Sequence, residues 1–335
     1  MNKKGGSDFS LDQIIEGVRR YQGVTRKNMI SAVIEFLPEH RNPNILAGFG
    51  EDAAVILDGD GDSTLLLATD GIMEDFLNAD PFFAGYCAVL VNVNDIYAMG
   101  GTPLAMVETV SIRDFNAYRK VMAGVAMAIK KFDVPMVGGH THPDSNYAAI
   151  DIAILGSVKR GDVILSSTAQ PGDEIVFAVD LDGRINRKFP YAWDTTFFKD
   201  SKTLRKQTSV MNDLAYKHLL TSGKDISNPG SLGSLGMLLE TSNVGAVVDI
   251  TRIPKPKNIL MNRWVVLYPG IGFVVTCKKN SDEVCRLFRD ASISAEVCGR
   301  ITKGHKYVIT DGEEEGLLLD FEKDKITGIK KKEGD

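Results

Sequence analysis

The sequence has few cysteines, and none is spaced as in a metal site or a disulfide framework. The four cysteines of the 335-residue chain are scattered and form no Cys-x-x-Cys pair; they are Cys87, Cys277, Cys285 and Cys298. This spacing argues against a zinc ribbon or an iron–sulfur cluster. Isolated thiols are typical of the reducing cytoplasm, which is the predicted location.

Long apolar runs and concentrations of positive charge are also missing. No stretch approaches the roughly 20 apolar residues that span a bilayer, because Asn92, Asn94 and Asp151 interrupt the best candidates. The polar first ten residues lack the apolar core of a signal peptide. The chain has 39 Lys and Arg against 44 Asp and Glu, and no basic stripe. We therefore expect neither a membrane nor a nucleic-acid partner.

The common nucleotide-binding motifs are absent as well. No strand leads into Gly-x-Gly-x-x-Gly, and the glycines of residues 229–236 follow a polar stretch instead. A Walker motif and the protein-kinase motifs are not found. If the chain binds a nucleotide, it does so by another route.

Helical and strand patterns are mixed throughout, which predicts an α/β or α+β protein. The length predicts two domains, residues 1–160 and 161–335, divided at the turn-rich segment 161–172. The charged tail after Asp320 is predicted to be frayed. Helices are expected at 11–18, 26–37, 81–99, 114–132, 203–221, 231–241 and 281–290. Strands are expected at 53–57, 64–68, 104–112, 134–138, 148–158, 174–180, 245–250, 271–277 and 295–301.

Four aspartates stand at the edges of apolar elements: Asp52, Asp70, Asp95 and Asp225. A carboxylate in apolar surroundings is costly unless it is paired or bound to a metal. Oxygen ligands of this kind suit magnesium. The alternative is that each aspartate caps a helix or forms a turn, and spacing alone leaves both interpretations open.

Six strings stand in order along the chain: Gly-Glu-Asp-Ala-Ala-Val (50–55), Ala-Thr-Asp-Gly (68–71), Val-Asn-Asp-Ile-Tyr-Ala-Met-Gly-Gly-Thr-Pro (93–103), Val-Gly-Gly-His-Thr (137–141), Pro-Gly-Asp (171–173) and Asp-Ile-Ser (225–227). Taken together, these strings resemble one superfamily: aminoimidazole ribonucleotide synthase, thiamine-phosphate kinase, selenophosphate synthetase and a hydrogenase maturation protein. Within it, the segments 79–87, 138–143 and 223–230 look most like the synthase-related group that includes methanogenesis marker protein 2.

The resemblance implies the PurM-like two-domain fold, with an N-terminal α/β domain that forms a shared barrel in a homodimer and a C-terminal ferredoxin-like domain. It further implies an ATP site whose phosphates are held through magnesium ions. The implied metal ligands are Asp52, Asp70, Asp95 and Asp225, with Asp95 and Asp225 also central to catalysis. Thr69, Gly139, His140, Ser227 and Asn228 are implied to lie at the nucleotide.

The implied chemistry is transfer of the γ-phosphoryl group of ATP to a small, anionic metabolite, by a kinase or an amide-activating synthetase. Such an enzyme works by positioning and charge stabilisation rather than through a covalent nucleophile. The alternative is a nucleotide-binding assembly or regulatory protein that has lost turnover. A third hypothesis is a metal-dependent hydrolase built on His140, His142 and Asp144.

Three departures from thiamine-phosphate kinase argue against plain activity of that type. His140 replaces an aspartate, and its imidazole either ligates a softer metal or hydrogen-bonds a substrate or backbone group. Asn228 replaces a second aspartate, which leaves one magnesium position in doubt. Ser166 stands where the kinase has an arginine that helps to bind ATP.

Arg184 is a further candidate, in Asp182-Gly183-Arg184 after a predicted strand. Its guanidinium either binds a substrate phosphate or carboxylate, or shapes a turn together with Asp182.

Overall fold

The computed structural model describes residues 10–37, 42–59 and 61–330. The chain forms two compact units whose segments alternate along the sequence. Unit 1 contains residues 1–41, 165–181 and 219–335, and unit 2 contains residues 42–164 and 182–218. The predicted domain boundary at residue 160 remains a prediction. The two compact units are not separated at a single point of the sequence, because residues 182–218 are grouped with residues 42–164.

Unit 2 is built on a six-stranded sheet in the order β1-β2-β3-β6-β4-β5, with β1 and β5 at its two open edges. Only the β4–β5 pair is parallel; the others are antiparallel. The strands are β1 (Ile45–Ala47), β2 (Ala54–Leu57), β3 (Ser63–Gly71), β4 (Thr102–Ser111), β5 (Met136–His142) and β6 (Ala149–Lys159). The unit also contains α4 (Glu74–Ala79), α5 (Pro81–Ala98), α6 (Phe115–Phe132), η2 (Arg160–Asp162), β8 (Arg184–Ile185), β9 (Ala192–Asp194) and α7 (Ser201–Tyr216).

Helix α5 is the buried centre of unit 2, and its limits follow from the sequence. Asp80 caps it by accepting the N–H of Phe83, and Pro81 occupies the first turn, where its missing N–H costs nothing. Gly100, with φ of 76°, turns the chain away after the helix. Helices α5 and α6 approach closely, because a Cβ on Gly85 would overlap the backbone of Val121. This packing fixes α5 rigidly against its neighbours.

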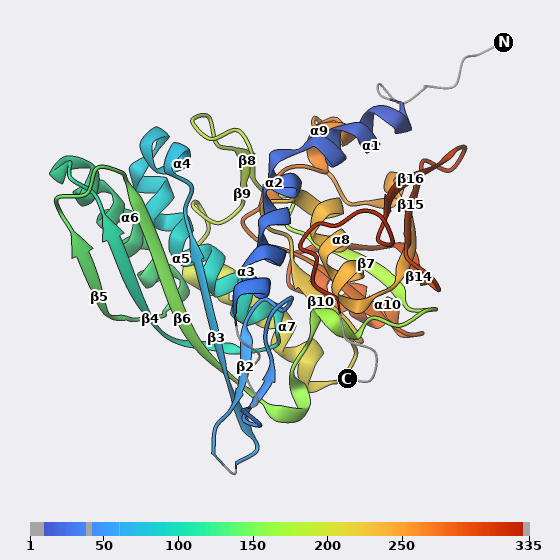
Figure 1. Cartoon of the computed structure of the whole chain (residues 1–335), viewed down its shortest axis with the longest axis horizontal. Helices are drawn as coiled ribbons and strands as arrows, with labels where there is room; N and C mark the ends of the chain where they lie inside the picture. Colours follow the sequence, from blue (N-terminus) through green and yellow to red (C-terminus); the bar gives the residue numbers. More distant parts are fainter. Residues whose placement is uncertain (1–9, 38–41, 60, 331–335) are drawn as a thin grey trace. The chain divides into compact units, whose positions relative to one another are not determined.

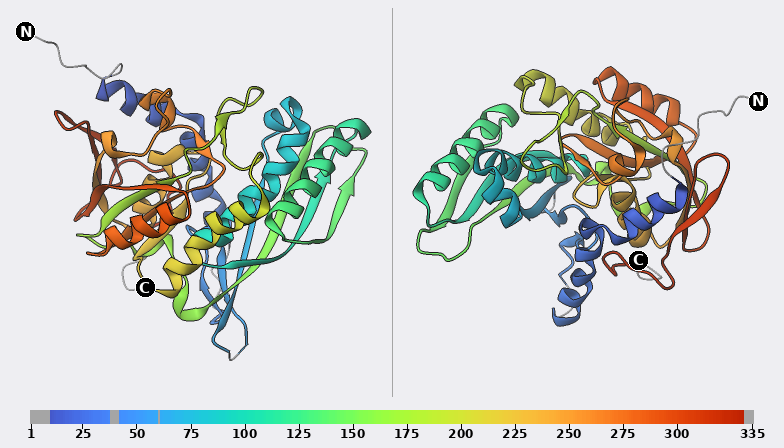
Figure 2. Two further views of the ribbon diagram at one scale, coloured as in Figure 1. Left: turned by 180° about the vertical axis from the view of Figure 1, so that it is seen from behind. Right: turned by 90° about the horizontal axis from the view of Figure 1, so that it is seen from above.

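The two faces of the six-stranded sheet differ in their surroundings. Helices α5 and α6 lie over the same face (Figures 1 and 2), where Leu66, Ile152 and Ile154 are fully buried. Because alternate residues of a strand point to opposite faces, the intervening side chains form the second face. This open face carries apolar side chains that are 44–66% exposed: Leu67, Leu104, Val107 and Val137.

Unit 1 is built on a seven-stranded sheet in the order β10-β13-β7-β14-β11-β15-β16. Its strands are β7 (Glu174–Val179), β10 (Ser222–Asp225), β11 (Gly245–Asp249), β13 (Gly272–Cys277), β14 (Ser294–Thr302), β15 (Lys306–Thr310) and β16 (Glu315–Asp320). Its helices are α1 (Leu11–Arg20), α2 (Gln22–Thr25), η1 (Arg26–Met29), α3 (Ile30–Phe36), η3 (Ser166–Thr168), α8 (Gly230–Ser242), η4 (Ile250–Arg252), α9 (Met261–Trp264) and α10 (Ser281–Asp290). The short β12 (Tyr268–Pro269) also belongs to this unit.

Helix α8 is buried along its whole length, and α10 packs on β7 and β14. Helix α1 begins with a capping box formed by Ser10 and Gln13. Among the residues that the structure describes, none of the helices combines the length and apolar character that a membrane span requires.

The prediction of a frayed tail after Asp320 is wrong for residues 321–330; residues 331–335 lie outside the described part. Ile326 and Thr327 are buried. They are held by the buried Glu240 of α8, whose carboxylate accepts the backbone N–H groups of Ile326, Thr327 and Gly328. The charged composition of the tail concealed this anchor, because its acceptor lies about 90 residues earlier in the sequence.

All four cysteines are buried free thiols. Burial raises the pKa of Cys277 and of Cys298 to about 12, and it raises the pKa of Cys87 and of Cys285 above the ordinary value. A thiol that stays protonated at neutral pH is a poor nucleophile. The cysteines therefore pack as small apolar side chains.

Candidate functional site

Asp52 and Asp95 are brought together beside the C-terminal end of α5. Asp52 lies in the loop before β2, where the next residue, Ala53, is buried and donates its N–H to Sδ of Met99 at 3.0 Å. Asp95 lies one turn before the end of α5, at a partly exposed position of an otherwise buried stretch. One carboxylate oxygen of Asp52 lies within 4.8 Å of one of Asp95. The rigid helix end therefore holds two carboxylates close together.

Two carboxylates at this separation repel each other. At 4 Å and an effective dielectric constant near 20, the repulsion amounts to about 4 kcal/mol. A divalent cation between the carboxylates would offset it, and an all-oxygen donor set suits magnesium rather than a softer metal. The side chains present therefore fit the metal that the sequence implied.

Asp70, at the end of β3, is fixed to the same helix through Asn92. The side-chain amide of the fully buried Asn92 accepts the N–H of Asp70 at 3.1 Å and donates to its carbonyl oxygen at 3.2 Å. The Asp70 carboxylate is exposed and accepts the N–H of Gly71 at 2.8 Å. Asn92 is thus a positioning residue for Asp70. In the sequence, it stands out as a polar residue within an apolar helix.

Thr69 and His140 lie on the open face of the sheet, whereas Asp70 lies on the helix-covered face. Thr69 is adjacent to Asp70 in β3, so the two side chains leave the strand on opposite sides. The Thr69 hydroxyl donates to the carbonyl oxygen of Ile152 at 3.0 Å. His140 pairs in register with Thr109, which in turn pairs with Asp151 of the same open face. The structure of unit 2 therefore does not group these two residues with Asp52 and Asp95.

His140 and His142 are neighbours on β5, with ring centroids 4.5 Å apart at an interplanar angle of 69°. Both side chains are exposed. Within the described ranges, no group of three close metal-ligating side chains includes His140, His142 or Asp144. The hydrolase hypothesis therefore has no preformed metal site to support it.

Gly139 has a structural reason to be glycine. It pairs with Glu108 of β4, and a Cβ at Gly139 would overlap the Glu108 carboxylate. One oxygen of that carboxylate is buried and has no hydrogen-bond partner among the described residues. Glu108 is an acidic residue in a largely apolar strand, Thr102–Ser111. The Glu108 side chain therefore fills the space that a side chain at position 139 would need.

The remaining predicted residues, Asp225, Ser227, Asn228 and Ser166, belong to unit 1. Asp225 is buried at the end of β10, and the N–H of Ser227 donates to the hydroxyl of Ser234 in α8. Asn228 packs so closely on Gly23 of α2 that a Cβ there would overlap it. Ser166 is buried and its hydroxyl donates to the carbonyl oxygen of Gly223. Ser166 therefore has a structural role within unit 1, and this position lacks the positive charge of the arginine found in thiamine-phosphate kinase.

Comparison with known proteins places this fold and these strings in one family. Residues 50–158 match the family model of the AIR synthase related protein N-terminal domain, and residues 182–312 match that of its C-terminal domain. The chain therefore belongs to the AIR synthase related protein family, within the PurM-like superfamily. The α/β two-domain PurM-like fold predicted from the sequence is confirmed.

Individual relatives agree with this assignment. An uncharacterized protein of Methanocaldococcus jannaschii is 46% identical over 96% of this chain and 100% of its own length. The selenide, water dikinase of Carboxydothermus hydrogenoformans is 26% identical over 72% of this chain and 71% of its own. The solved structure of T. maritima PurL complexed with ATP has a TM-score of 0.77 at 15% identity, covering 95% of this chain and 52% of that one. This likeness to PurL concerns the fold alone.

Proposed function

We propose that this protein binds ATP with magnesium and transfers the γ-phosphoryl group to a small anionic metabolite. The observation that carries the proposal is the pair of carboxylates, Asp52 and Asp95, held within 4.8 Å of each other at the rigid end of α5. A relative named as a dikinase and a structural neighbour solved with ATP support the nucleotide. Asp70, of the same unit, joins them in the proposed ligand set, and Asp225 remains a ligand that the family resemblance implies.

The proposed division of labour follows from the chemistry of phosphoryl transfer. Bound magnesium would neutralise negative charge on the phosphates. The aspartates would orient the triphosphate so that the acceptor oxygen attacks the γ-phosphorus as the bond to the β–γ bridging oxygen breaks. No thiol nucleophile is required, in keeping with four buried cysteines. Catalysis would rest on positioning and charge stabilisation.

Calorimetric titration of the full chain with ATP, with and without magnesium, tests the binding step. We expect binding that requires magnesium, followed by ADP formation once a suitable acceptor is added from a pool of metabolites. Magnesium-dependent binding with no ADP formation from any pool would favour the non-catalytic assembly protein. Absence of ATP binding would contradict the proposal.

We further propose that the open face of the six-stranded sheet is the homodimer interface. Leu67, Leu104, Val107 and Val137 are each 44% exposed or more on that face. Apolar patches of this kind commonly mark interaction surfaces. A second copy would cover them in the shared barrel that the family resemblance implies.

A charge placed on this face should separate the dimer. We expect Val107→Glu and Val137→Glu each to yield monomers by light scattering, because a carboxylate would be desolvated in the interface. Leu260→Glu, at a 45% exposed leucine of unit 1, is the matched control and should remain dimeric. A monomeric parent protein, or dimers that persist in both sheet variants, would contradict the interface.

A further inference from the structure

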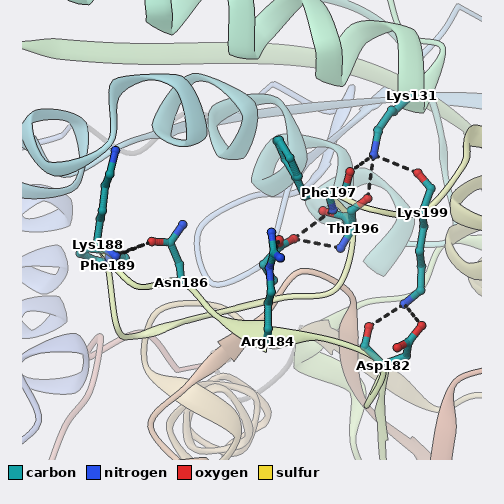
Figure 3. Close-up of polar contacts among 10 residues, drawn as sticks. Lys131, Asp182, Arg184, Asn186, Lys188, Phe189, Thr196, Phe197 and Lys199 are labelled. Carbon is teal, nitrogen blue, oxygen red and sulfur yellow. Dashed lines mark hydrogen bonds and ion pairs between the residues drawn. The ribbon is translucent and has the colours of Figure 1, made fainter.

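The segment from Asp182 to Asp200, which we call the anchor loop, is fixed to α6 by one half-buried cation, Lys131. Lys131 donates to the carbonyl oxygens of Thr196 and Lys199 at 2.9 Å each, and also to that of Phe197 (Figure 3). Burial lowers the pKa of Lys131, an effect opposed by nearby carboxylates. All three N–H donors of the Lys131 ammonium group are bonded to backbone carbonyl oxygens of the loop, and these bonds fix the conformation of the loop.

The two ends and the tip of the anchor loop are held as well. Lys199 donates to the carbonyl oxygen of Asp182 at 2.9 Å, which joins the ends of the loop (Figure 3). At the tip, Asn186 accepts the N–H of Phe189 at 3.0 Å, and the Phe189 ring stacks on Phe76 of α4 at 4.1 Å between centroids. A surface loop with this many anchors is a rigid platform rather than a flexible connection.

Arg184 is the residue that this platform presents. Its guanidinium carbon lies 3.4 Å from the ring centroid of Phe198, and Nε lies 3.9 Å from the carboxylate of Asp194. Asp194 is buried and is itself fixed by accepting the N–H groups of Thr196 and Phe197. At 3.9 Å the carboxylate orients the guanidinium by charge without taking a hydrogen bond from it. The Arg184 side chain remains 60% exposed.

A guanidinium with a fixed plane and an accessible edge is suited to one kind of ligand. Its parallel N–H groups match the two oxygens of a carboxylate or phosphate, and prior fixation of the plane lowers the entropic cost of binding. Lys188 adds positive charge to the same loop, although it lies 3.6 Å from the carboxylate of Asp80. Lys131 holds the backbone on both sides of Phe198, the residue whose ring lies against the Arg184 guanidinium.

We infer that Arg184 binds the anionic group, carboxylate or phosphate, of the acceptor substrate, and that Lys131 is a positioning residue that acts through the anchor loop. Identification of the ligand as the acceptor rests on the proposed function. Anion binding by Arg184 does not, because it requires neither ATP nor magnesium.

The test is a titration of the full chain, free of nucleotide and magnesium, with inorganic phosphate and separately with acetate. The readout is the NMR signal of the Arg184 Nε–H group. We expect a saturable shift with at least one probe, and the tighter probe identifies the anionic group. The variants are compared with the parent by calorimetry, which needs no Nε–H group at position 184. Phe198→Leu, which removes only an exposed ring, and Arg184→Lys should weaken binding, and Arg184→Gln should weaken it at least about tenfold. Arg187→Gln is the matched control and should bind as the parent does.

Lys131→Met should weaken anion binding in the same assay, and Lys131→Arg, which retains a cation, should recover much of it. A purely structural role for Lys131 would change stability but not this affinity. The Asp95→Asn variant should bind the anion normally, so failure of the ATP proposal is distinguishable from failure of this one. Absence of a saturable shift in the parent, or unchanged affinity in Arg184→Gln monitored by calorimetry, would overturn the inference.

Discussion

Replacing Asp95 with asparagine should lower the magnesium-dependent affinity for ATP by at least about 10–100-fold, the range by which loss of a partner of a metal ligand already weakens metal binding. Asparagine keeps the shape of the side chain but removes its charge. The same change should stabilise the metal-free protein by about 1–4 kcal/mol, because it removes the repulsion between the carboxylates of Asp52 and Asp95. Calorimetry with ATP and thermal unfolding without magnesium measure the two effects.

The opposite signs of these two effects are what make the test specific. A damaged fold would lower both the ATP affinity and the stability. Loss of a metal-binding carboxylate should instead lower the ATP affinity and raise the stability of the metal-free protein. Asp52→Asn should behave alike, and the double variant should gain little more stability, since either change alone removes the repulsion. Asp58→Asn, at an exposed position in the same unit, is the matched control and should change neither property. Unchanged ATP affinity in Asp95→Asn would count against the site.

Local signals predicted the long helices well. Asp80-Pro81 and Gly100 mark the limits of α5, and the structure places that helix at Pro81–Ala98. Helix α7 was predicted to run to residue 221 but ends at Tyr216, because His218 adopts a φ of 51°, outside the helical range. Strand β10 was missed because its sequence, Ser-Gly-Lys-Asp, shows no apolar alternation. It is a strand because it pairs along its whole length with β13, a tertiary cause that a local pattern does not contain.

The same distinction explains the candidate site. Asp52, Asp70 and Asp95 could be proposed from short strings, since each stands at the edge of an element. The face on which a side chain lies depends on strand register, which separates Thr69 and His140 from Asp70. The contacts that hold the Arg184 loop could not be predicted from local sequence either, because Lys131 lies more than 50 residues before the loop that it contacts.

Replacing Glu240 with glutamine should destabilise unit 1 by about 3 kcal/mol, although the two side chains have the same size. The buried Glu240 carboxylate accepts three backbone N–H groups and the hydroxyl of Thr327, at 2.7–3.1 Å. In glutamine one of the two acceptor oxygens becomes an NH₂ donor, which would face N–H groups that then lack a partner. Hydrogen bonds to a charged acceptor contribute about 1.5–3 kcal/mol each, so the loss of one oxygen accounts for the estimate.

Amide hydrogen exchange resolves this effect at the tail itself. The N–H groups of Ile326 and Thr327 should exchange slowly in the parent and faster in Glu240→Gln, by about 100-fold for 3 kcal/mol. Thr327→Val, which removes only the hydroxyl contact, should produce a smaller change of the same sign. Glu313→Gln, at an exposed carboxylate, is the matched control and should change neither exchange nor stability. Equal protection in the parent and in Glu240→Gln would show that the tail is held by its buried apolar side chain, Ile326, rather than by the carboxylate.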